Sequence, residues 1–394
     1  MKHIKRFFQK IFHGIEYVFI VLGYFCCFPI AYLIYKRKHI WLIAEIGFDA
    51  RDNGYHFFKY LNENQKQINS IYLIYKRNHK YSDVSKLGRT IKPCSFKHFL
   101  MFIAADVKAS SNVFGCSPNS YLTKYLLKHH GTGINVALKH GIFKNLHPNY
   151  FKKNAHLDLI CCGAKPEYEF VNKNFGYQEG VAQYIGLARF DALHNFECKN
   201  EIFVMPTWRR WLDGVSIEEF QKSDYFNSWN NFLNNKNLQQ LLDKNNLDLV
   251  FFVHPKLNKY LSLYQINNKH ISFMNVGEGD DIQAHLKSAK ILITDFSSVY
   301  FDFAYMRKPT LYFQFDEEMF NAKHYEQGYF DYRENGFGPV SKTEDELLTN
   351  LNQIIKNNYS LDEKYKNRIN DFFVLSDSQN SERIYEAIIE KLKH

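Results

Sequence analysis

The stretch ILITDFSSVYFDFA, residues 291–304, contains the pattern from which the fold is predicted. Its apolar beginning is typical of a buried strand that ends at Asp295, and the residues after Ser298 favour a helix. A buried strand followed directly by a helix is the repeating unit of a parallel sheet that helices cover on both faces.

The same alternation of short apolar runs and helical stretches continues on both sides of this stretch. Two consecutive series, joined near residues 192–200, predict an α/β fold with two Rossmann-like domains that face each other across a cleft. The expected strands lie within 41–46, 70–76, 96–111, 134–141, 157–163 and 182–191 in the first series, and 201–209, 247–255, 270–275, 289–295 and 309–315 in the second. Domain boundaries are expected at 40–195 and 196–380, with an N-terminal segment at 1–39 and an amphipathic helix at 381–394, for which Ser381 is the start signal.

Composition and charge narrow the possible partners. Hydrophobic residues make up 45% and charged residues 23% of the 394 residues, which is typical of a globular protein and excludes wholesale disorder. The net charge of +9 favours anionic partners. The lysines are scattered and no basic helix or zinc-finger spacing occurs, so nucleic acid is not expected among these partners.

The N-terminal segment has the composition of a membrane-associated helix. Residues 17–35 carry no charge and are mostly apolar, and basic residues stand on both sides, at 2–10 and 36–38. Nineteen residues can just span a bilayer. A helix lying in the plane of an anionic inner leaflet explains the two-sided charge equally well, and a buried core helix is the third alternative. The segment predicts a location at the cytoplasmic face of the cell membrane.

Ser297, Ser298 and Asp302 form the best local signal for chemistry. The serines follow the carboxyl end of a predicted strand, where open α/β sheets bind their ligands. Free N–H groups at a helix start favour a phosphate, and Asp302 falls one turn later on the same face. The alternative is that Ser298 caps the helix without any ligand.

Two histidines stand at the ends of predicted strands, one in each domain. His254 follows the run VFFV and precedes a proline, whereas His140 follows the run INVAL and precedes Gly141. Glycine permits a close approach of the backbone, so His140 can lie in a tight loop. Each histidine taken singly could instead have only a structural role.

Arginines near the domain junction suit the recognition of phosphate. Arg189 and Arg209 lie close to residues 192–200, and a guanidinium group binds phosphate with two parallel hydrogen bonds. The chain contains no D-x-D sequence, phosphate-binding G-x-x-x-x-G-K-[ST] loop or H-E-x-x-H sequence. The residues therefore indicate phosphate chemistry with neither a metal site nor another cofactor.

Several short blocks, in order, resemble the CDP-glycerol glycerophosphotransferases, which build teichoic acids and similar capsular polymers. The blocks cover about residues 41 to 340 and are ARDNGYHFFKYL (50–61), KHGIFK (139–144), GLARFD (186–191), PTWR (206–209), HPK (254–256), ITDFSSVYFDFA (293–304), KPTLYFQFD (308–316) and GYFDYRENGFGP (328–339). The resemblance implies a glycosyltransferase-B-type fold at a membrane surface. It also implies that glycerol phosphate passes from CDP-glycerol to a hydroxyl group of a lipid-linked saccharide or growing polymer, with release of CMP.

The resemblance also implies roles for individual residues. His140 would be the base that deprotonates the acceptor hydroxyl, and His254 would contact the phosphate groups undergoing transfer. The remaining matched positions would bind the donor, and they are Gly141, Arg189, Pro206, Thr207, Arg209, Ser297, Ser298 and Asp302.

Two positions depart from the family pattern, and other activities stay open. Lys139 stands where the family commonly has Trp or Gln, and Ile142 replaces a frequent Thr. CDP-ribitol is the nearest alternative donor, and a glycosyltransferase that uses a nucleotide sugar is the next alternative. The third is a non-catalytic surface module that binds anionic polymer, although mere binding needs neither strand-end histidine.

Overall fold

The computed structural model of the chain describes residues 2–118, 133–275, 282–323 and 328–393. The chain divides into two compact units. Unit 1 comprises residues 1–142, 147–192 and 377–394, and unit 2 comprises residues 143–146 and 193–376. The chain therefore passes between the units four times, and the C-terminal segment, which contains the predicted helix at 381–394, belongs to unit 1.

Unit 1 is built on a parallel sheet in which seven strands lie within the described residues, in the order β3-β2-β1-β4-β5-β6-β7. Its strands are β1 (Ile40–Ala44), β2 (Asn69–Leu73), β3 (Arg89–Ile91), β4 (Val107–Ser110), β5 (Ile134–Ala137), β6 (Leu159–Cys162) and β7 (Ala182–Tyr184). Its helices are α1 (Lys2–Tyr35), α2 (Asn53–Asn64), α3 (Tyr81–Leu87), α4 (Phe96–Ala104), α6 (Lys165–Asn174) and α15 (Asn380–Lys393).

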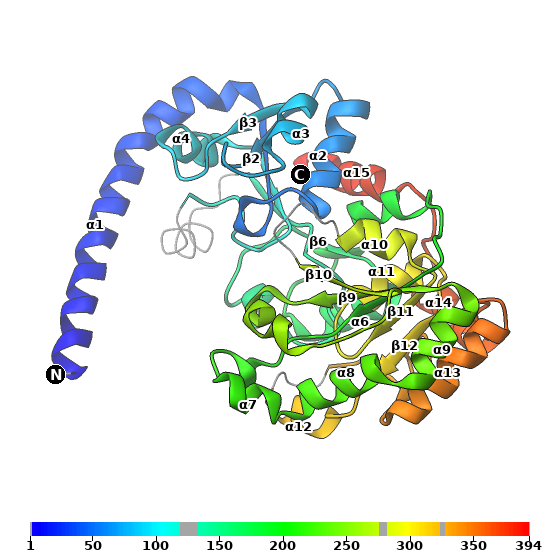
Figure 1. Cartoon of the computed structure of the whole chain (residues 1–394). Coiled ribbons are helices and arrows are strands. Elements are labelled where there is room, and N and C mark those ends of the chain that lie inside the picture. The colour runs from blue at the N-terminus through cyan, green and yellow to red at the C-terminus, as the bar shows by residue number, and fades with distance from the viewer. Residues whose placement is uncertain (1, 119–132, 276–281, 324–327, 394) are drawn as a thin grey trace. The chain divides into compact units, whose positions relative to one another are not determined.

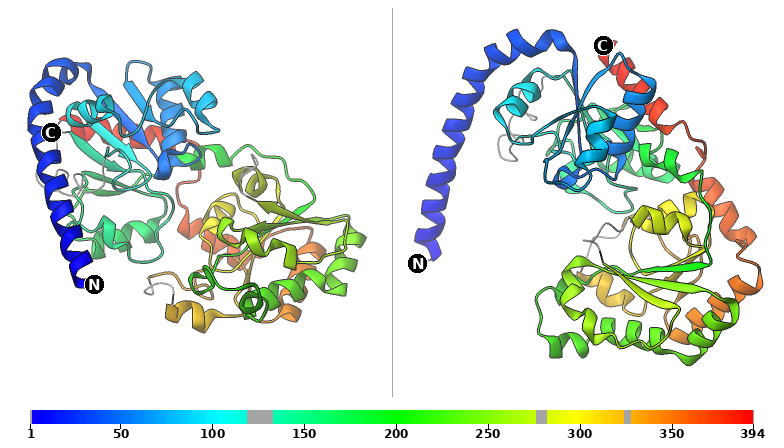
Figure 2. Two further views of the ribbon diagram at one scale, coloured as in Figure 1. Left: turned by 60° about the vertical axis from the view of Figure 1, so that its left-hand side comes forward. Right: turned by 45° about the horizontal axis from the view of Figure 1, so that its top comes forward.

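The side chains of β1 explain why this sheet is covered on both faces. Trp41 and Ile43 pack in a cluster with residues of α2 and α15, whereas the alternating residues Ile40, Leu42 and Ala44 pack in a cluster with residues of α4. Every residue of β1 is buried, which accounts for its continuous apolar sequence. Figures 1 and 2 show these helices around the sheet of unit 1.

Unit 2 repeats this plan with a second parallel sheet, whose six strands among the described residues follow the order β10-β9-β8-β11-β12-β13. The strands are β8 (Glu201–Met205), β9 (Asp248–Val253), β10 (Ile271–Asn275), β11 (Ile291–Thr294), β12 (Thr310–Phe313) and β13 (Val340–Ser341). The helices are α7 (Ile217–Gln221), α8 (Asp224–Asn234), α9 (Lys236–Asn245), α10 (Ile282–Ser288), α11 (Val299–Tyr305), α12 (Glu317–Lys323), α13 (Glu344–Lys356) and α14 (Glu363–Phe372).

The faces of the second sheet are also both covered. Ile202 and Val204 of β8 belong to a large core that contains Trp229 of α8 and Leu238 of α9. Phe203, which lies between them in the sequence, stacks on His285 of α10 with ring centroids 5.4 Å apart. The predicted α/β fold with parallel sheets is therefore confirmed. The facing arrangement of the two domains stays a prediction.

The N-terminal segment forms one long helix, α1, which contains Pro29. Near its end, Cys27 and Ala31 are buried against Leu100 and Ile103 of α4. Many apolar side chains between residues 15 and 34 are exposed. Within the described residues, no helix combines the length and the apolar character needed to cross a membrane.

The start of α15 differs from the predicted one. The Asp191 carboxylate accepts hydrogen bonds from the backbone N–H groups of Asn380 (2.9 Å) and Ser381 (2.8 Å), so a residue nearly 190 positions earlier, and not Ser381, caps this helix. Two short edge strands, β3 and β13, were also absent from the sequence prediction. Both are too short to leave a clear pattern.

Replacing Ile388 by Ala tests how much α15 contributes to unit 1. Ile388 is fully buried beside Phe57 and Phe58, so the substitution should lower the free energy of unfolding by about 2–5 kcal/mol through lost burial and a new cavity. Urea unfolding followed by circular dichroism measures the change. Leu392→Ala on the same helix is the control, because Leu392 is 40% exposed. Equal effects of the two substitutions would show that α15 is not part of the core.

Candidate functional site

The order of the strands places a switch point in each sheet. The order reverses between β1 and β4 in unit 1, and between β8 and β11 in unit 2. Ligands of open α/β sheets bind outside the carboxyl ends of the strands at such points. Pro206 and Thr207 follow β8, and Ser297 and Ser298 follow β11, so these predicted residues lie at the switch point of unit 2.

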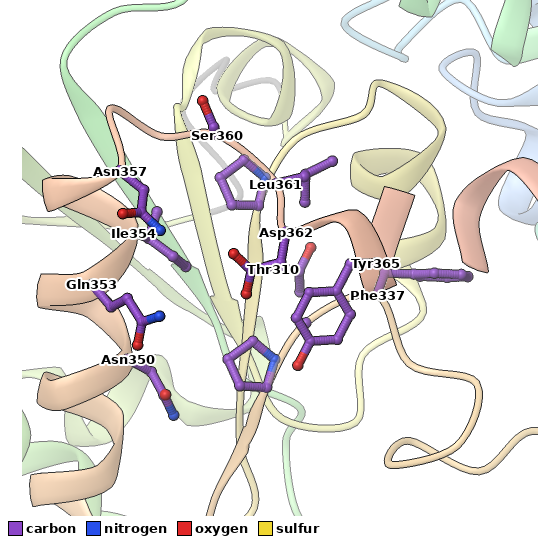
Figure 3. A pocket seen from close by; sticks show the side chains of 13 residues that line it. Thr310, Phe337, Asn350, Gln353, Ile354, Asn357, Ser360, Leu361, Asp362 and Tyr365 are labelled. Carbon is purple, nitrogen blue, oxygen red and sulfur yellow. The ribbon is translucent and has the colours of Figure 1, made fainter. Parts of the chain in front are cut away.

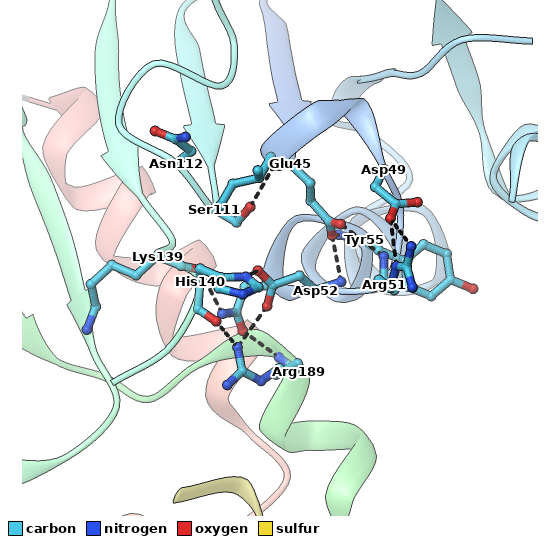
Figure 4. Close-up of polar contacts among 12 residues, drawn as sticks. Glu45, Asp49, Arg51, Asp52, Tyr55, Ser111, Asn112, Lys139, His140 and Arg189 are labelled. Carbon is cyan, nitrogen blue, oxygen red and sulfur yellow. Dashed lines mark hydrogen bonds and ion pairs between the residues drawn. The ribbon is translucent and has the colours of Figure 1, made fainter. Parts of the chain in front are cut away.

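In unit 1, His140 is paired with the carboxylate of Asp52 (Figure 4). The imidazole Nδ1 lies 2.6 Å from Oδ2 of Asp52, and the other carboxylate oxygen accepts a hydrogen bond from Arg189 (2.8 Å). Arg189 also donates to the backbone carbonyl of His140. Asp52 is only 6% exposed, whereas the His140 side chain is 71% exposed. A buried carboxylate thus holds an imidazole that remains open to solvent.

This pairing sets the protonation of both groups. The hydrogen bond with Asp52 raises the pKa of His140. Burial alone would raise the pKa of Asp52, but the charge of Arg189 and the contact with His140 lower it. Asp52 is therefore ionised, and its carboxylate fixes the tautomer with the proton on Nδ1. That tautomer leaves the lone pair of Nε2 available to accept a proton.

Two buried polar residues hold this pair in place. The Glu45 carboxylate follows β1 and accepts hydrogen bonds from the backbone N–H groups of Arg51, Asp52 and Tyr55 (2.6–2.9 Å). Asn53, which is fully buried, donates to the carbonyl oxygen of Lys139 and accepts from the N–H of Arg189, both at 2.9 Å. Asn53 therefore ties the segments that carry His140 and Arg189 to the start of α2.

Glu45 itself carries a shifted pKa. Burial and the neighbouring charge of Asp52 raise the pKa of Glu45 to about 8, although three backbone N–H groups favour its ionised form. Of the two neighbouring carboxylates, Asp52 and Glu45, Asp52 therefore ionises first as the pH rises.

Lys139, one of the two departures from the family pattern, is fully buried and forms an ion pair with Glu167. The other oxygen of Glu167 accepts a hydrogen bond from the N–H of Gly163 (2.7 Å). The backbone of Lys139 is in the left-handed region, with φ at +61°. A non-glycine residue keeps this conformation only where its surroundings fix it. The buried ion pair therefore supports the tight turn that presents His140.

In unit 2, a second buried carboxylate joins the two strands at the switch point. Asp295, which follows β11 and is fully buried, accepts hydrogen bonds from the N–H of Thr207 and from the Arg209 guanidinium group, both at 2.8 Å. Arg209 also forms two parallel hydrogen bonds with Asp316 (2.7 and 2.8 Å). The turn after β8 is thereby fixed to the turn after β11.

The environment of Arg209 differs from the one expected for a donor contact. Its side chain is fully buried, and the rings of Tyr225, Phe296, Phe315 and Phe320 lie 5.0–5.7 Å from its guanidinium carbon. Asp295 and Asp316 raise the pKa of Arg209 despite its burial. A direct contact with a ligand would require these ion pairs to open. In this structure Arg209 positions the Thr207 turn.

Ser297, Ser298 and Asp302 lie together at the start of α11. Ser298 is exposed, and its side chain makes no capping hydrogen bond, so capping does not occupy this hydroxyl group. Ser297 is half-buried, and Asp302 is buried within α11.

His254, at the end of β9, has the opposite hydrogen-bonding pattern to His140. Its Nδ1 accepts a hydrogen bond from the backbone N–H of Lys256 (3.3 Å), and its ring stacks on Trp208 with centroids 5.6 Å apart. Burial and the charge of Lys256 lower the pKa of His254, so its imidazole is neutral at pH 7. Because Nδ1 is an acceptor, the single proton is on Nε2, which can donate to a phosphate oxygen.

The structure thus brings His140, Gly141 and Arg189 together in unit 1, and Pro206, Thr207, Arg209, Ser297, Ser298 and Asp302 around the switch point of unit 2, with His254 on the adjacent β9. The residues that sequence reasoning missed are Glu45, Asp52, Asn53, Asp295 and Asp316. A local signal exists for each of them, because Glu45 and Asp295 directly follow apolar strands, Asp52 and Asp316 directly precede helices, and Asn53 is the first residue of α2. In the described part of the chain, no group of three or more His, Cys, Asp or Glu residues could hold a metal ion.

Comparisons with known proteins extend this description. The sequence profile of the family described as CDP-glycerol:poly(glycerophosphate) glycerophosphotransferase matches residues 27–390. The minor teichoic acid biosynthesis protein GgaB of Bacillus subtilis (strain 168) is 30% identical over 372 residues, which are 91% of this chain but 40% of GgaB. The chain therefore spans less than half the length of that relative.

Two further comparisons cover nearly whole proteins. The teichoic acid poly(glycerol phosphate) polymerase of Bacillus spizizenii (strain ATCC 23059 / NRRL B-14472 / W23) is 23% identical over 84% of this chain and 87% of its own length. The structure of the wall teichoic acid polymerase TagF superposes with a TM-score of 0.67 at 18% identity and covers 98% of each chain. The likeness to TagF shows a common fold.

Replacing Asp52 by Asn tests the pairing with His140. The amide would donate to Nδ1 and favour the tautomer whose Nε2 carries the proton, and the loss of charge should lower the pKa of His140. We expect the histidine titration, followed by NMR, to move to lower pH. Asp49→Asn is the matched control, because Asp49 binds Arg51 and makes no hydrogen bond with His140. An unchanged His140 titration in Asp52→Asn would contradict the pairing.

Proposed function

Because the chain belongs to the CDP-glycerol:poly(glycerophosphate) glycerophosphotransferase family, we propose that it transfers glycerol phosphate from CDP-glycerol to a hydroxyl group. The acceptor is a lipid-linked saccharide or a growing polymer of teichoic acid or capsule, and CMP is released. The observation that carries the proposal is the hydrogen bond of His140 Nδ1 with the buried Asp52 carboxylate, because the neutral tautomer that it favours leaves Nε2 of an exposed imidazole able to accept a proton.

The chemistry needs a base for the acceptor and donors for the phosphate. In the proposed reaction, Nε2 of His140 takes the proton of the acceptor hydroxyl, whose oxygen forms a bond to the phosphorus that carries glycerol. The bond from that phosphorus to the oxygen of CMP breaks, and CMP leaves. Such transfer depends chiefly on positioning and on stabilising negative charge. Arg189, fixed by Asp52, sets the orientation of the base in unit 1.

Unit 2 carries groups that suit the diphosphate of the donor. The Nε2–H of the neutral His254 can donate to a phosphate oxygen, and the Ser297 and Ser298 hydroxyls add donors at the switch point. Arg209 acts by holding the Thr207 turn through Asp295. We assign no cofactor or metal ion a part in the reaction.

The proposal includes association of α1 with the cytoplasmic face of the cell membrane. Ile15, Val18, Leu22 and Phe25 are between 54% and 64% exposed on this helix, and large exposed apolar side chains of this kind mark interaction surfaces. Basic residues flank the apolar stretch in the sequence and would contact anionic lipid headgroups. An enzyme held there would meet a lipid-linked acceptor.

Replacing His140 by Ala should reduce turnover by roughly 10²–10⁴-fold, the usual contribution of a general base, and leave donor binding largely unchanged. The assay measures nucleotide released from CDP-glycerol, CDP-ribitol and UDP-sugars in the presence of a lipid-linked acceptor. His156→Ala is the control, since His156 is exposed and contacts Asp158, which is not among the site residues. Near-normal turnover in His140→Ala would show that His140 is not the general base. Release of CMP from CDP-ribitol but not from CDP-glycerol would show that ribitol phosphate is the group transferred. Release of UDP alone would overturn the proposal.

Vesicle sedimentation tests the membrane proposal. The double substitution Leu22→Glu and Phe25→Glu places charge on the exposed apolar face of α1 and should release the protein from vesicles that contain anionic lipid. Val374→Glu is the matched control, because Val374 is an exposed apolar residue of unit 2. Equal sedimentation of the double variant and the unsubstituted protein would rule out α1 as the attachment.

A further inference from the structure

Unit 2 contains a cavity that lies away from the switch point of its sheet. The cavity has a volume of about 160 Å³ and opens between α13, the start of α14 and the amino ends of β12 and β13 (Figure 3). The predicted donor-binding residues follow the carboxyl ends of β8 and β11, at the opposite edge of the same parallel sheet. The two sites are therefore separate.

The walls of the cavity are rich in uncharged polar groups. Asn350, Gln353 and Asn357 recur at helical spacing along α13 and its end, so their amide groups share one face of the helix. Asn350 donates to the Ser341 hydroxyl (3.0 Å), but the amide groups of Gln353 and Asn357 make no hydrogen bond within the described residues. Both can thus donate to and accept from a ligand.

The other walls add a carboxylate, an aromatic ring and a buried hydroxyl. Asp362 and Tyr365 come from the start of α14, and the Asp362 carboxylate has no hydrogen-bonding partner in the described part of the chain. Thr310 is fully buried at the amino end of β12, and its hydroxyl lacks a partner there as well. A buried polar group without a partner is uncommon and destabilising, so the Thr310 hydroxyl points to a ligand or a bound water. Asp362, Gln353 and Asn357 are exposed, so their polar groups are open to a ligand that enters from solvent.

The charge of the lining selects the class of ligand. No Lys, Arg or His lines the cavity, and Asp362 is its one charged residue, so an anion would be repelled. We propose that this cavity binds a neutral polyhydroxy compound, a sugar or an alditol. Hydroxyl groups can donate to Asp362 and to the amide oxygens and accept from the amide nitrogens. The ring of Tyr365 and the side chain of Phe337 can pack against the C–H groups.

The size of the cavity agrees with one residue of a sugar. A protein cavity of roughly 150 Å³ accommodates a six-membered ring. The bound compound is either a free molecule or one unit of a glycan chain, and both present the same hydroxyl groups. This cavity and the switch point lie at opposite ends of the strands, so binding here is independent of the proposed transfer reaction.

Calorimetric titration of the full chain with ribitol and with methyl glucoside tests the proposal. We expect saturable binding that Gln353→Ala and Asp362→Ala each weaken by roughly fivefold or more, the effect of losing a hydrogen bond of about 1 kcal/mol. Asn352→Ala is the matched control, since Asn352 is an exposed amide on α13 that does not line the cavity. Ribitol 5-phosphate should bind more weakly than ribitol.

Further titrations distinguish a free compound from one unit of a glycan chain, and they test whether a ligand of another class binds instead. Tighter binding of a glycan oligomer than of ribitol, again weakened by Gln353→Ala, would identify the ligand as a polymer unit, and equal binding would identify a free compound. No binding, undiminished binding in both variants, tighter binding of ribitol 5-phosphate, or binding of Ca²⁺ in place of the polyols would overturn the proposal. CMP release from CDP-glycerol should be unchanged in Gln353→Ala, and its loss would contradict a separate site.

Discussion

The carboxylate of Asp52 is the group on which the geometry of unit 1 depends. It lies at the start of α2 and receives His140 on one oxygen and Arg189 on the other. A buried charge is tolerated only when its partners satisfy it, so the strand end and the turn that carry these residues must both approach α2. Glu45 and Asn53 secure that approach through backbone hydrogen bonds.

In unit 2, another buried carboxylate, that of Asp295, fixes the turns that follow the strands. Asp295 and Asp316 hold Arg209, which leaves the turn after β8 fixed beside the turn after β11. The two strand-end histidines then differ in a way that their sequences do not reveal. His140 donates a hydrogen bond from Nδ1 to a carboxylate, whereas His254 accepts one at Nδ1 from a backbone N–H group. The Nε2 atom of His140 can therefore accept a proton, whereas the Nε2–H group of His254 can donate a hydrogen bond.

The sequence predicted the sheets well because their strands are buried on both faces and therefore read as continuous apolar runs. The sequence singles out the histidines and the serines after β11 because they follow such runs within a few residues. It does not single out Asp52 and Asn53, since a polar residue at the start of a helix is ordinarily a cap, and only the fold shows which residues lie opposite. Arg209 was expected to contact the donor because sequence does not distinguish an arginine that faces a ligand from one enclosed by two carboxylates and four rings. The cap of α15 joins Asp191 to Asn380 and Ser381, nearly 190 residues later, so no local sequence pattern predicts it.

The return of the chain to unit 1 after residue 376 has a consequence for biosynthesis. Ile384 and Ile388 complete the core around Phe57 and Phe58, so that core stays open while residues 143–376 are being translated. Domains generally fold in order from the N-terminus as the ribosome releases them. Here the first sheet emerges early with an apolar groove still uncovered, and unit 2 forms as an insertion before the groove is closed. A nascent chain interrupted within unit 2 would expose that groove to chaperones and proteases, which distinguishes incomplete products from finished ones.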